Sequence, residues 1–147
     1  MNAYTSAPSA QVDRFVHDRL PPTQQWPILR YDRPELQFPA QVNVVEELLD
    51  KAAAKGWGAR PLLRSPKIAL SYDDVRERVD RICRVLVEDL KLVPGNRVLI
   101  RGGNSIGLAL AWLAVVKAGM VAVATMPLLR ARELGDIIDR SQPAVAL

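Results

Sequence analysis

Two short groups of residues in this chain have the composition of ligand-binding sites. The first is Gly102-Gly103-Asn104-Ser105, which lies between two apolar runs. If it joins a strand to a helix, backbone N–H groups and the helix dipole there could bind a phosphate. The group lacks the Lys-Ser/Thr of a P-loop and the third glycine of a dinucleotide fingerprint. The favoured interpretation is therefore a tight turn in which Asn104 or Ser105 caps the helix.

The second group is the basic loop Leu128–Glu133, which carries Arg130 and Arg132. It follows an apolar run that reads as a parallel strand, and ligands of open α/β sheets bind at the carboxyl ends of such strands. Arginine is suited to phosphate, and two cations in the first turn of a helix oppose its dipole. We therefore consider Arg130 and Arg132 candidate contacts for an anionic group. The alternative is a pair of surface arginines.

The remaining reactive side chains do not form a site. The chain has one cysteine and one histidine, which excludes an internal disulfide and a zinc site of the usual kind. Cys83 lies on the apolar stripe of a predicted helix, so we expect a core residue and not a nucleophile. His17 has no apparent partner in the sequence. Motifs alone therefore identify no active site.

The elements that would position the two candidate groups alternate in type. Alternating strands and helices at this spacing predict an α/β fold with a mostly parallel sheet and crossover helices. The predicted strands of this sheet are 97–101, 121–125 and 143–147, and the predicted helices are 105–118 and 130–139.

Upstream, Asn43 and Ser71 are predicted to cap two further helices, with short strands at 61–64 and 68–71 between them. On the second of these helices an acid precedes a base by four residues three times, which predicts a charged, solvated face. The three pairs are Asp74/Arg78, Glu77/Arg81 and Asp80/Arg84.

The first 41 residues show no clear periodicity and carry several prolines, so residues 1–41 are predicted to be an irregular arm and residues 42–147 a partial α/β subdomain. A short helix at 11–18 is one possibility. We expect the arm to lie on the surface of the subdomain through four apolar side chains. These are Trp26, Tyr31, Leu36 and Phe38.

Composition limits the possible partners. The net charge is +4, but the arginines are interleaved with acids and no basic run contains aromatics, which argues against nucleic acid and suits an anionic small molecule. The longest apolar stretch, 106–116, is shorter than the ~20 residues of a membrane span, so no membrane partner is expected. Cysteine usage and the polar N-terminus suggest the cytoplasm.

The sequence resembles the adenylate-forming (AMP-binding) ligases, the superfamily of acyl- and aryl-CoA synthetases. Leu70–Val75 looks like the first core signature of this superfamily, and Val116–Pro127 looks like the second. Within it, the chain is most similar to benzoate- and 2-aminobenzoate-CoA ligases. That closer similarity rests on Leu20–Pro27, Val93–Gly102 and Ala122–Glu133. Gly103 departs from the pattern, since many relatives have proline there.

The resemblance implies a two-step reaction on an aromatic carboxylic acid. The carboxylate attacks ATP to give an acyl-adenylate and pyrophosphate, with magnesium offsetting phosphate charge, and the thiol of coenzyme A then displaces AMP. In some relatives the loop after the second signature lies near the coenzyme A nucleotide, which makes Arg130 and Arg132 the expected contacts to its phosphates. The catalytic motifs of the superfamily lie downstream of the matched segments.

The resemblance further implies that the chain is the N-terminal part of such a ligase. We expect it to be inactive by itself, to bind none of these cofactors tightly, and to self-associate or aggregate through an exposed sheet edge. Two alternatives remain open: a free-standing binding module that has the fold without the chemistry, and an unrelated Rossmann-like nucleotide binder that uses Gly102–Ser105.

Overall fold

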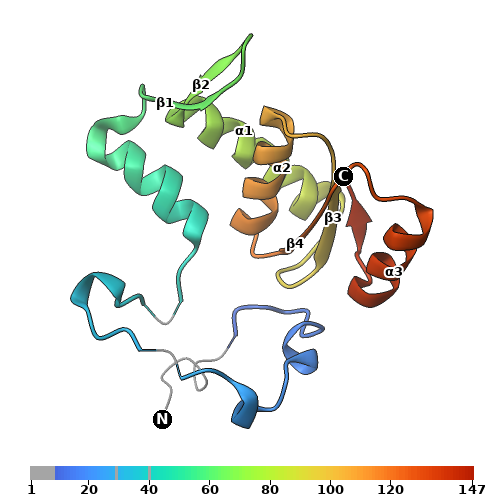
Figure 1. Ribbon diagram of the computed structural model, residues 1–147. Coiled ribbons are helices and arrows are strands. Elements are labelled where there is room, and N and C mark those ends of the chain that lie inside the picture. The colour runs from blue at the N-terminus through green and yellow to red at the C-terminus, as the bar shows by residue number, and fades with distance from the viewer. Residues whose placement is uncertain (1–8, 29, 40) are drawn as a thin grey trace.

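A three-stranded parallel sheet organises the carboxyl-terminal half of the computed structural model, which describes residues 9–28, 30–39 and 41–147. Its strands are β3 (Arg97–Arg101), β4 (Val121–Thr125) and β5 (Val145–Ala146), in the order β4-β3-β5 (Figure 1). Val98 aligns with Ala122 on one side and with Val145 on the other. The predicted parallel α/β fold is confirmed, with β3 as its central strand.

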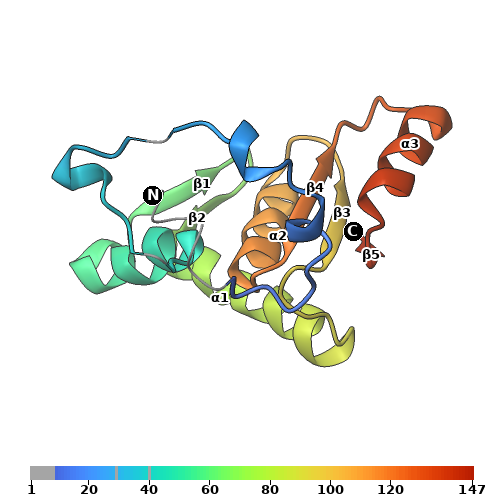
Figure 2. The same ribbon diagram turned by 90° about the horizontal axis from the view of Figure 1, so that it is seen from below.

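Two helices connect these strands on opposite sides of the sheet (Figures 1 and 2). Helix α2 (Ile106–Lys117) joins β3 to β4, and α3 (Ala131–Ser141) joins β4 to β5. Because β4 and β5 flank β3 on different sides, right-handed crossovers require the two helices to lie on opposite faces. Strand β5 has only two residues, but hydrogen bonds between this segment and β3 extend from Ala144 to Leu147. The hydrogen-bonded segment is therefore close to the predicted strand 143–147.

Helix α1 (Tyr72–Arg84) packs against α2 and begins at the predicted cap. The hydroxyl of Ser71 accepts a hydrogen bond from the Asp74 N–H (3.1 Å), and the Asp74 carboxylate accepts one from the Ser71 N–H (2.8 Å). This reciprocal arrangement satisfies two backbone donors that the first helical turn leaves free. The helix continues as one wider turn, η6 (Val85–Asp89).

The segment before α1 contains an irregular helix and a hairpin. The helix begins after Asn43, whose side-chain oxygen accepts from the Val45 N–H at 3.1 Å, and it contains the wide turns η4 (Glu46–Asp50) and η5 (Ala53–Trp57). Gly56, at a φ of 79°, turns the chain out of the helical path. Strands β1 (Pro61–Arg64) and β2 (Ala69–Ser71) then pair antiparallel.

The core lies between these helices and the face of the sheet that carries Val98 and Ile100. Its side chains come from the first helix, α1, η6, β3 and α2, so the core joins the two halves of the chain. Fully buried members include Val45, Leu49, Val75, Val79, Leu86, Val98, Ile100, Ala114 and Val115. Since β3 is buried on both faces, its continuous apolar run is typical of a central parallel strand.

The described residues of the arm before residue 42 are irregular and contain the short turns η1 (His17–Arg19), η2 (Thr23–Gln25) and η3 (Pro34–Leu36). The possible helix at 11–18 does not form, because the Asp13 carboxylate accepts the Phe15 N–H and so competes with helical bonding. Leu36 and Phe38, 40% and 55% exposed, do not anchor the arm as predicted. The domain boundary at residue 41 stays a prediction.

Candidate functional site at the carboxyl ends of the parallel strands

The two groups of candidate residues meet at the carboxyl ends of β3 and β4. Arg101 ends β3 and is in register with Thr125, which ends β4. The glycine turn follows the first of these residues and the basic loop follows the second, so both lie at the edge where ligands of parallel sheets bind (Figure 1).

The glycine turn has the geometry of a strand-to-helix connection. The Ser105 hydroxyl accepts a hydrogen bond from the Leu108 N–H (3.2 Å) and so caps α2. Neither Gly102 nor Gly103 has a positive φ, and a Cβ at position 103 would meet no atom within 4 Å. These features fit the favoured interpretation of a capped turn and show no crowded backbone cradle for a phosphate.

Arg101 holds the loop that follows β4, a role that the sequence did not reveal. Its Nη2 atom donates to the carbonyl oxygens of Pro127 and Leu129, both at 2.8 Å. The loop residue between these two carbonyls, Leu128, is 85% exposed. One guanidinium therefore fixes the backbone that leads into Arg130.

Arg130 and Arg132 are both exposed at the beginning of α3. The carboxylate of Glu133 accepts the Arg130 backbone N–H at 3.0 Å, which caps the helix without engaging the guanidinium. Within the described residues, neither guanidinium forms an ion pair with a carboxylate. Their charges are available to a ligand at this edge.

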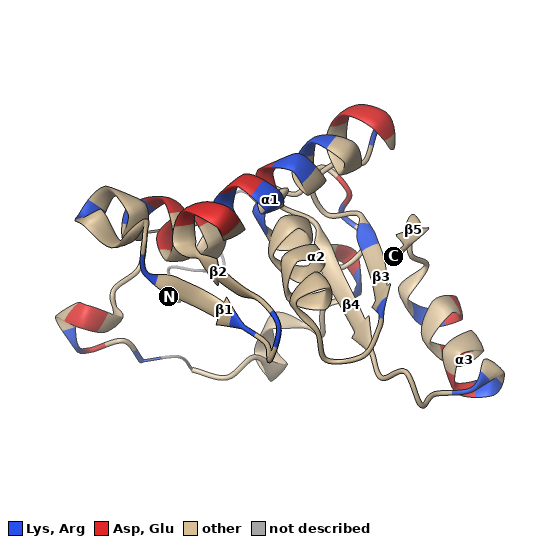
Figure 3. Cartoon of the chain, turned by 90° about the horizontal axis from the view of Figure 1, so that it is seen from above, with Lys and Arg blue, Asp and Glu red and all other residues tan. Residues whose placement is uncertain are grey.

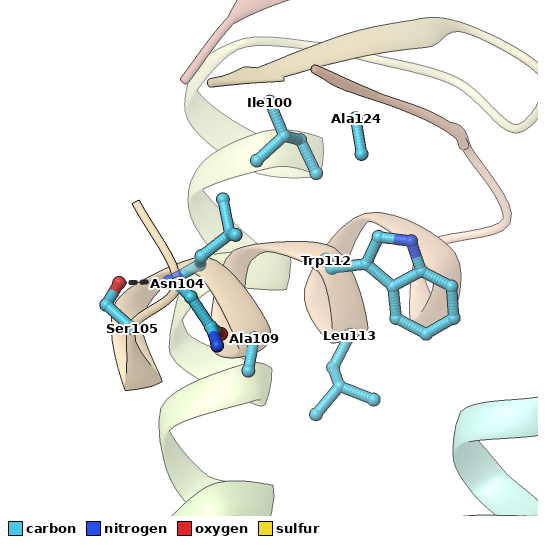
Figure 4. Close-up of a pocket in the computed structure, with 8 residues that line it drawn as sticks. Ile100, Asn104, Ser105, Ala109, Trp112, Leu113 and Ala124 are labelled. Carbon is cyan, nitrogen blue, oxygen red and sulfur yellow. Dashed lines mark hydrogen bonds between the residues drawn. The ribbon is translucent and has the colours of Figure 1, made fainter. Parts of the chain in front are cut away.

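A cavity of about 340 Å³ lies beside this edge, between α2 and the face of the sheet (Figure 4). Ile100 and Ala124, which are paired across β3 and β4, form one side, and the half-exposed Trp112 closes another. Asn104 and Ser105 are its polar lining residues. A largely apolar cavity of this size with a few polar groups is typical of small-molecule sites.

Lys117 ends α2 and lies within the predicted second signature, and its ammonium group joins three helices. Its Nζ lies 2.7 Å from Asp80 Oδ1 and 3.0 Å from Asp50 Oδ2. Burial alone disfavours the ammonium, yet the hydrogen bonds to Asp80 and Asp50 raise the pKa of Lys117 above its ordinary value. Charged residues lie along the length of α1, whereas α2 has no charged residue other than Lys117 (Figure 3).

Of the three charge pairs predicted on α1, whose residues are all described, Glu77 and Arg81 alone form an ion pair. Asp80 pairs with Lys117 instead of Arg84, and Asp74 serves the helix cap. The prediction failed at these positions because spacing along one helix does not reveal partners on a neighbouring helix.

Cys83 packs against the core, whereas His17 lies on the surface. The Cys83 thiol donates to the Ala114 carbonyl at 3.2 Å, and burial raises its pKa, so a core role is confirmed. His17 is exposed and its Nδ1 lies 3.0 Å from Arg14 Nη2, a partner that the sequence did not indicate. In the described ranges, no three His, Cys, Asp or Glu side chains are grouped to hold a metal ion, and no helix is long and apolar enough to cross a membrane.

Comparison with known proteins gives consistent matches. The family described as AMP-binding enzyme matches residues 50–147. Benzoate–CoA ligase of Thauera aromatica is 25% identical over 114 residues, which are 78% of this chain and 22% of the relative. A salicyl-AMP ligase / salicyl-S-ArCP synthetase of Mycobacterium tuberculosis is 39% identical over 66 residues, which are 45% of this chain and 12% of that protein.

Solved structures agree in fold. The anthranilate CoA ligase AuaEII in complex with anthranoyl-AMP superposes with a TM-score of 0.68 and 20% identity, over 74% of this chain and 20% of that one. Apo MatB from Rhodopseudomonas palustris gives a TM-score of 0.65 and 25% identity, over 71% and 20%. The chain thus spans about a fifth of the length of benzoate–CoA ligase. Because the family match covers more than half of the chain, this chain belongs to the AMP-binding enzyme family.

Proposed function

We propose that this chain acts as the N-terminal part of an ATP-dependent ligase that joins an aromatic carboxylic acid to coenzyme A. The observation that carries the proposal is the family match over residues 50–147. The reaction would form an acyl-adenylate and pyrophosphate first and a thioester second, with magnesium supporting the first step. A solved relative, MatB, has been crystallised with ATP bound.

The proposed substrate class is an aryl acid of the benzoate or 2-aminobenzoate type. One sequence relative is a benzoate–CoA ligase, and one structural neighbour is an anthranilate CoA ligase. The relative from Mycobacterium tuberculosis is named a salicyl-S-ArCP synthetase, so its name gives ArCP, a carrier protein, and not coenzyme A. The acceptor therefore has to be established separately from the acid.

In this proposal Arg130 and Arg132 contact the phosphates of coenzyme A. Their exposure, the absence of carboxylate partners among the described residues and their place at the carboxyl edge of the sheet support the assignment. Guanidinium groups bind phosphate through paired hydrogen bonds, which suits this role. Arg101 would act indirectly by holding the loop through the carbonyls of Pro127 and Leu129.

The test uses the complete gene product that contains this chain, purified from its source. With magnesium and ATP, we expect benzoate or 2-aminobenzoate to drive exchange of pyrophosphate into ATP. Addition of coenzyme A should then yield the aryl thioester. If exchange occurs but a thioester forms only when a carrier protein is added, coenzyme A is not the acceptor and that part of the proposal is wrong. Failure of every aryl acid to drive exchange would overturn the proposed reaction.

We further propose that the 147-residue chain alone is inactive and that the ligase works in the cytoplasm. Strands β4 and β5 are the outer strands of the described sheet, and unpaired strand edges promote self-association. Thioester formation by the isolated chain would contradict its proposed inactivity. Tight coenzyme A binding by a soluble, cooperatively unfolding chain would instead favour a free-standing binding module.

A further inference from the structure

The N-terminal arm is attached to the domain at the amino end of β3, opposite the candidate site. The backbone N–H groups of Val12 and Asp13 both donate to the carbonyl of Pro94, each at 2.9 Å. The Asp13 carboxylate accepts from Asn96 Nδ2 at 2.8 Å and also from the guanidinium of Arg97. Figure 2 shows this blue segment beside the strands of the sheet. Backbone and side chain are thus recognised together.

Arg97 is the centre of this attachment and is only 7% exposed. Its other donors bind the carbonyl oxygens of Ser141 (2.9 Å), Gln142 (2.9 Å) and Gly95 (3.1 Å). Within the described residues, Asp13 is the carboxylate paired with this buried cation. The guanidinium therefore has three carbonyl partners from the domain and takes its counter-ion from the arm.

An aromatic ring completes the recognition. Phe15 lies against the Arg97 guanidinium, whose Cζ is 4.1 Å from the ring centroid. The Phe15 N–H also donates to Asp13 Oδ1 at 2.9 Å, so the carboxylate and the ring are held in one local conformation. One cation contacts both a carboxylate and a ring two residues further along the peptide. Together these two contacts fix the register of the peptide, so the site selects the sequence Asp-x-aromatic.

The domain surface is shaped for close approach of this peptide. A Cβ added at Gly95 would lie 2.2 Å from the Asp13 carbonyl oxygen and 3.1 Å from Gln11 Cβ. Gly95 also has a φ of 93°, which favours glycine. Any larger side chain at this position would displace the arm.

We propose that the amino end of the parallel sheet is a peptide-binding site that recognises an Asp-x-aromatic segment, and that residues 11–16 of the same chain occupy it as a latch. The site is distinct from the coenzyme site proposed at the carboxyl ends, and it does not depend on the ligase reaction. The latch couples the arm to β3 and, through Ser141 and Gln142, to the end of α3.

Limited trypsin digestion tests whether the latch is closed. The bond Arg14–Phe15 lies inside the latch and the bond Arg30–Tyr31 lies outside it. Both join an arginine to an aromatic residue, so the two trypsin sites are similar in sequence. We expect cleavage after Arg14 to be at least about tenfold slower than cleavage after Arg30, because cleavage requires local opening. Asp13→Asn or Gly95→Ala should remove this difference.

The matched control is Gly56→Ala, since Gly56 also has a positive φ (79°) but its added Cβ would meet nothing within 4 Å. This variant carries backbone strain without a clash against the arm, and it should leave the protection of Arg14 intact. Equal cleavage after Arg14 and Arg30 in the unaltered chain would overturn the latch. Loss of protection in Gly56→Ala alone would do the same.

A second measurement tests the site itself. In the full chain carrying Asp13→Ala and Phe15→Ala, the site should be vacated and a labelled peptide of residues 9–20 should bind, as followed by fluorescence anisotropy. The same peptide with Asp13→Ala should bind at least about tenfold more weakly. If neither peptide binds a double variant whose circular dichroism matches that of the unaltered chain, or both bind equally, the proposal is wrong.

Discussion

The two ends of β3 each carry an arginine, and the two side chains are used in opposite ways. Arg97, at the amino end, is buried and has carbonyl, carboxylate and aromatic partners. Arg101, at the carboxyl end, is exposed and holds only a loop, beside which Arg130 and Arg132 face solvent without carboxylate partners in the described residues.

The difference in burial and in partners separates the arginine that stabilises the fold from the arginines that are available to a ligand. At the amino end the positive charge is already neutralised by Asp13, whose pKa the Phe15 N–H and Arg97 lower to about 2. At the carboxyl end, Arg130 and Arg132 have no carboxylate partner among the residues that the structure describes, and they lie where parallel sheets bind ligands. Both ends of β3 carry positive charge, so charge alone does not distinguish the structural arginine from the arginines available to a ligand.

The largest expected effect follows from removing the buried cation. Arg97→Met should lower the free energy of unfolding by about 3–5 kcal/mol, because Asp13 and three carbonyl groups lose their donor. Arg132→Met, the matched change at the exposed end, should stay within about 0.5 kcal/mol. Urea unfolding at pH 7 measures both. Similar losses for the two variants would contradict the comparison.

Acid should weaken the amino end next. Because the folded pKa of Asp13 is about 2 and the ordinary pKa of an aspartate is 3.8, the Asp13 contribution is complete above about pH 5 and is lost as the pH falls toward 2. The loss should be at most about 2 kcal/mol, since water reaches part of this carboxyl group.

Thermal unfolding from pH 6 to pH 2 reports this loss when the unaltered chain is compared with Asp13→Asn. Asp13→Asn should be the less stable protein at pH 6, and the gap should narrow as the pH falls. A constant gap over this range would show that the Asp13 charge does not hold the arm.

Lys117 provides a smaller test away from both ends of the sheet. Lys117→Met should cost about 1–2 kcal/mol, because Asp50 and Asp80 would then face each other without a cation. The exposed pair of Lys51 and Glu47 is the control, and Lys51→Met should cost no more than about 0.5 kcal/mol. Equal costs in urea unfolding would mean that the three-helix junction adds nothing beyond a surface pair.

Local pattern was sufficient to predict the parallel sheet and the helix caps. The bounds of β3 and β4 match the prediction, because each is a short apolar run that ends at a turn, with Gly102-Gly103 after β3 and Met126-Pro127 after β4. Ser71 caps α1 as predicted, and Ser105 is the one of the two candidates Asn104 and Ser105 that caps α2, since a cap depends on residues within one helical turn.

Long-range pairing could not be predicted. Asp13 and Arg97 are 84 positions apart, and nothing in the local sequence of either indicates the other. The same holds for Lys117 with Asp50, for Arg101 with its loop and for the cavity beside Trp112. The arm was expected to attach through its largest apolar side chains, whereas its described hydrogen bonds are to Arg97 and to the turn that precedes β3.

The central claim is that Arg130 and Arg132 serve a coenzyme, and the most direct measurement is the KM for coenzyme A in the complete ligase. Arg130→Ala with Arg132→Ala should raise this KM by about tenfold or more, because two phosphate contacts are lost. Aryl-acid-dependent exchange of pyrophosphate, which precedes coenzyme A, should stay unchanged. An unchanged KM for coenzyme A, with thioester formation intact, would contradict the account.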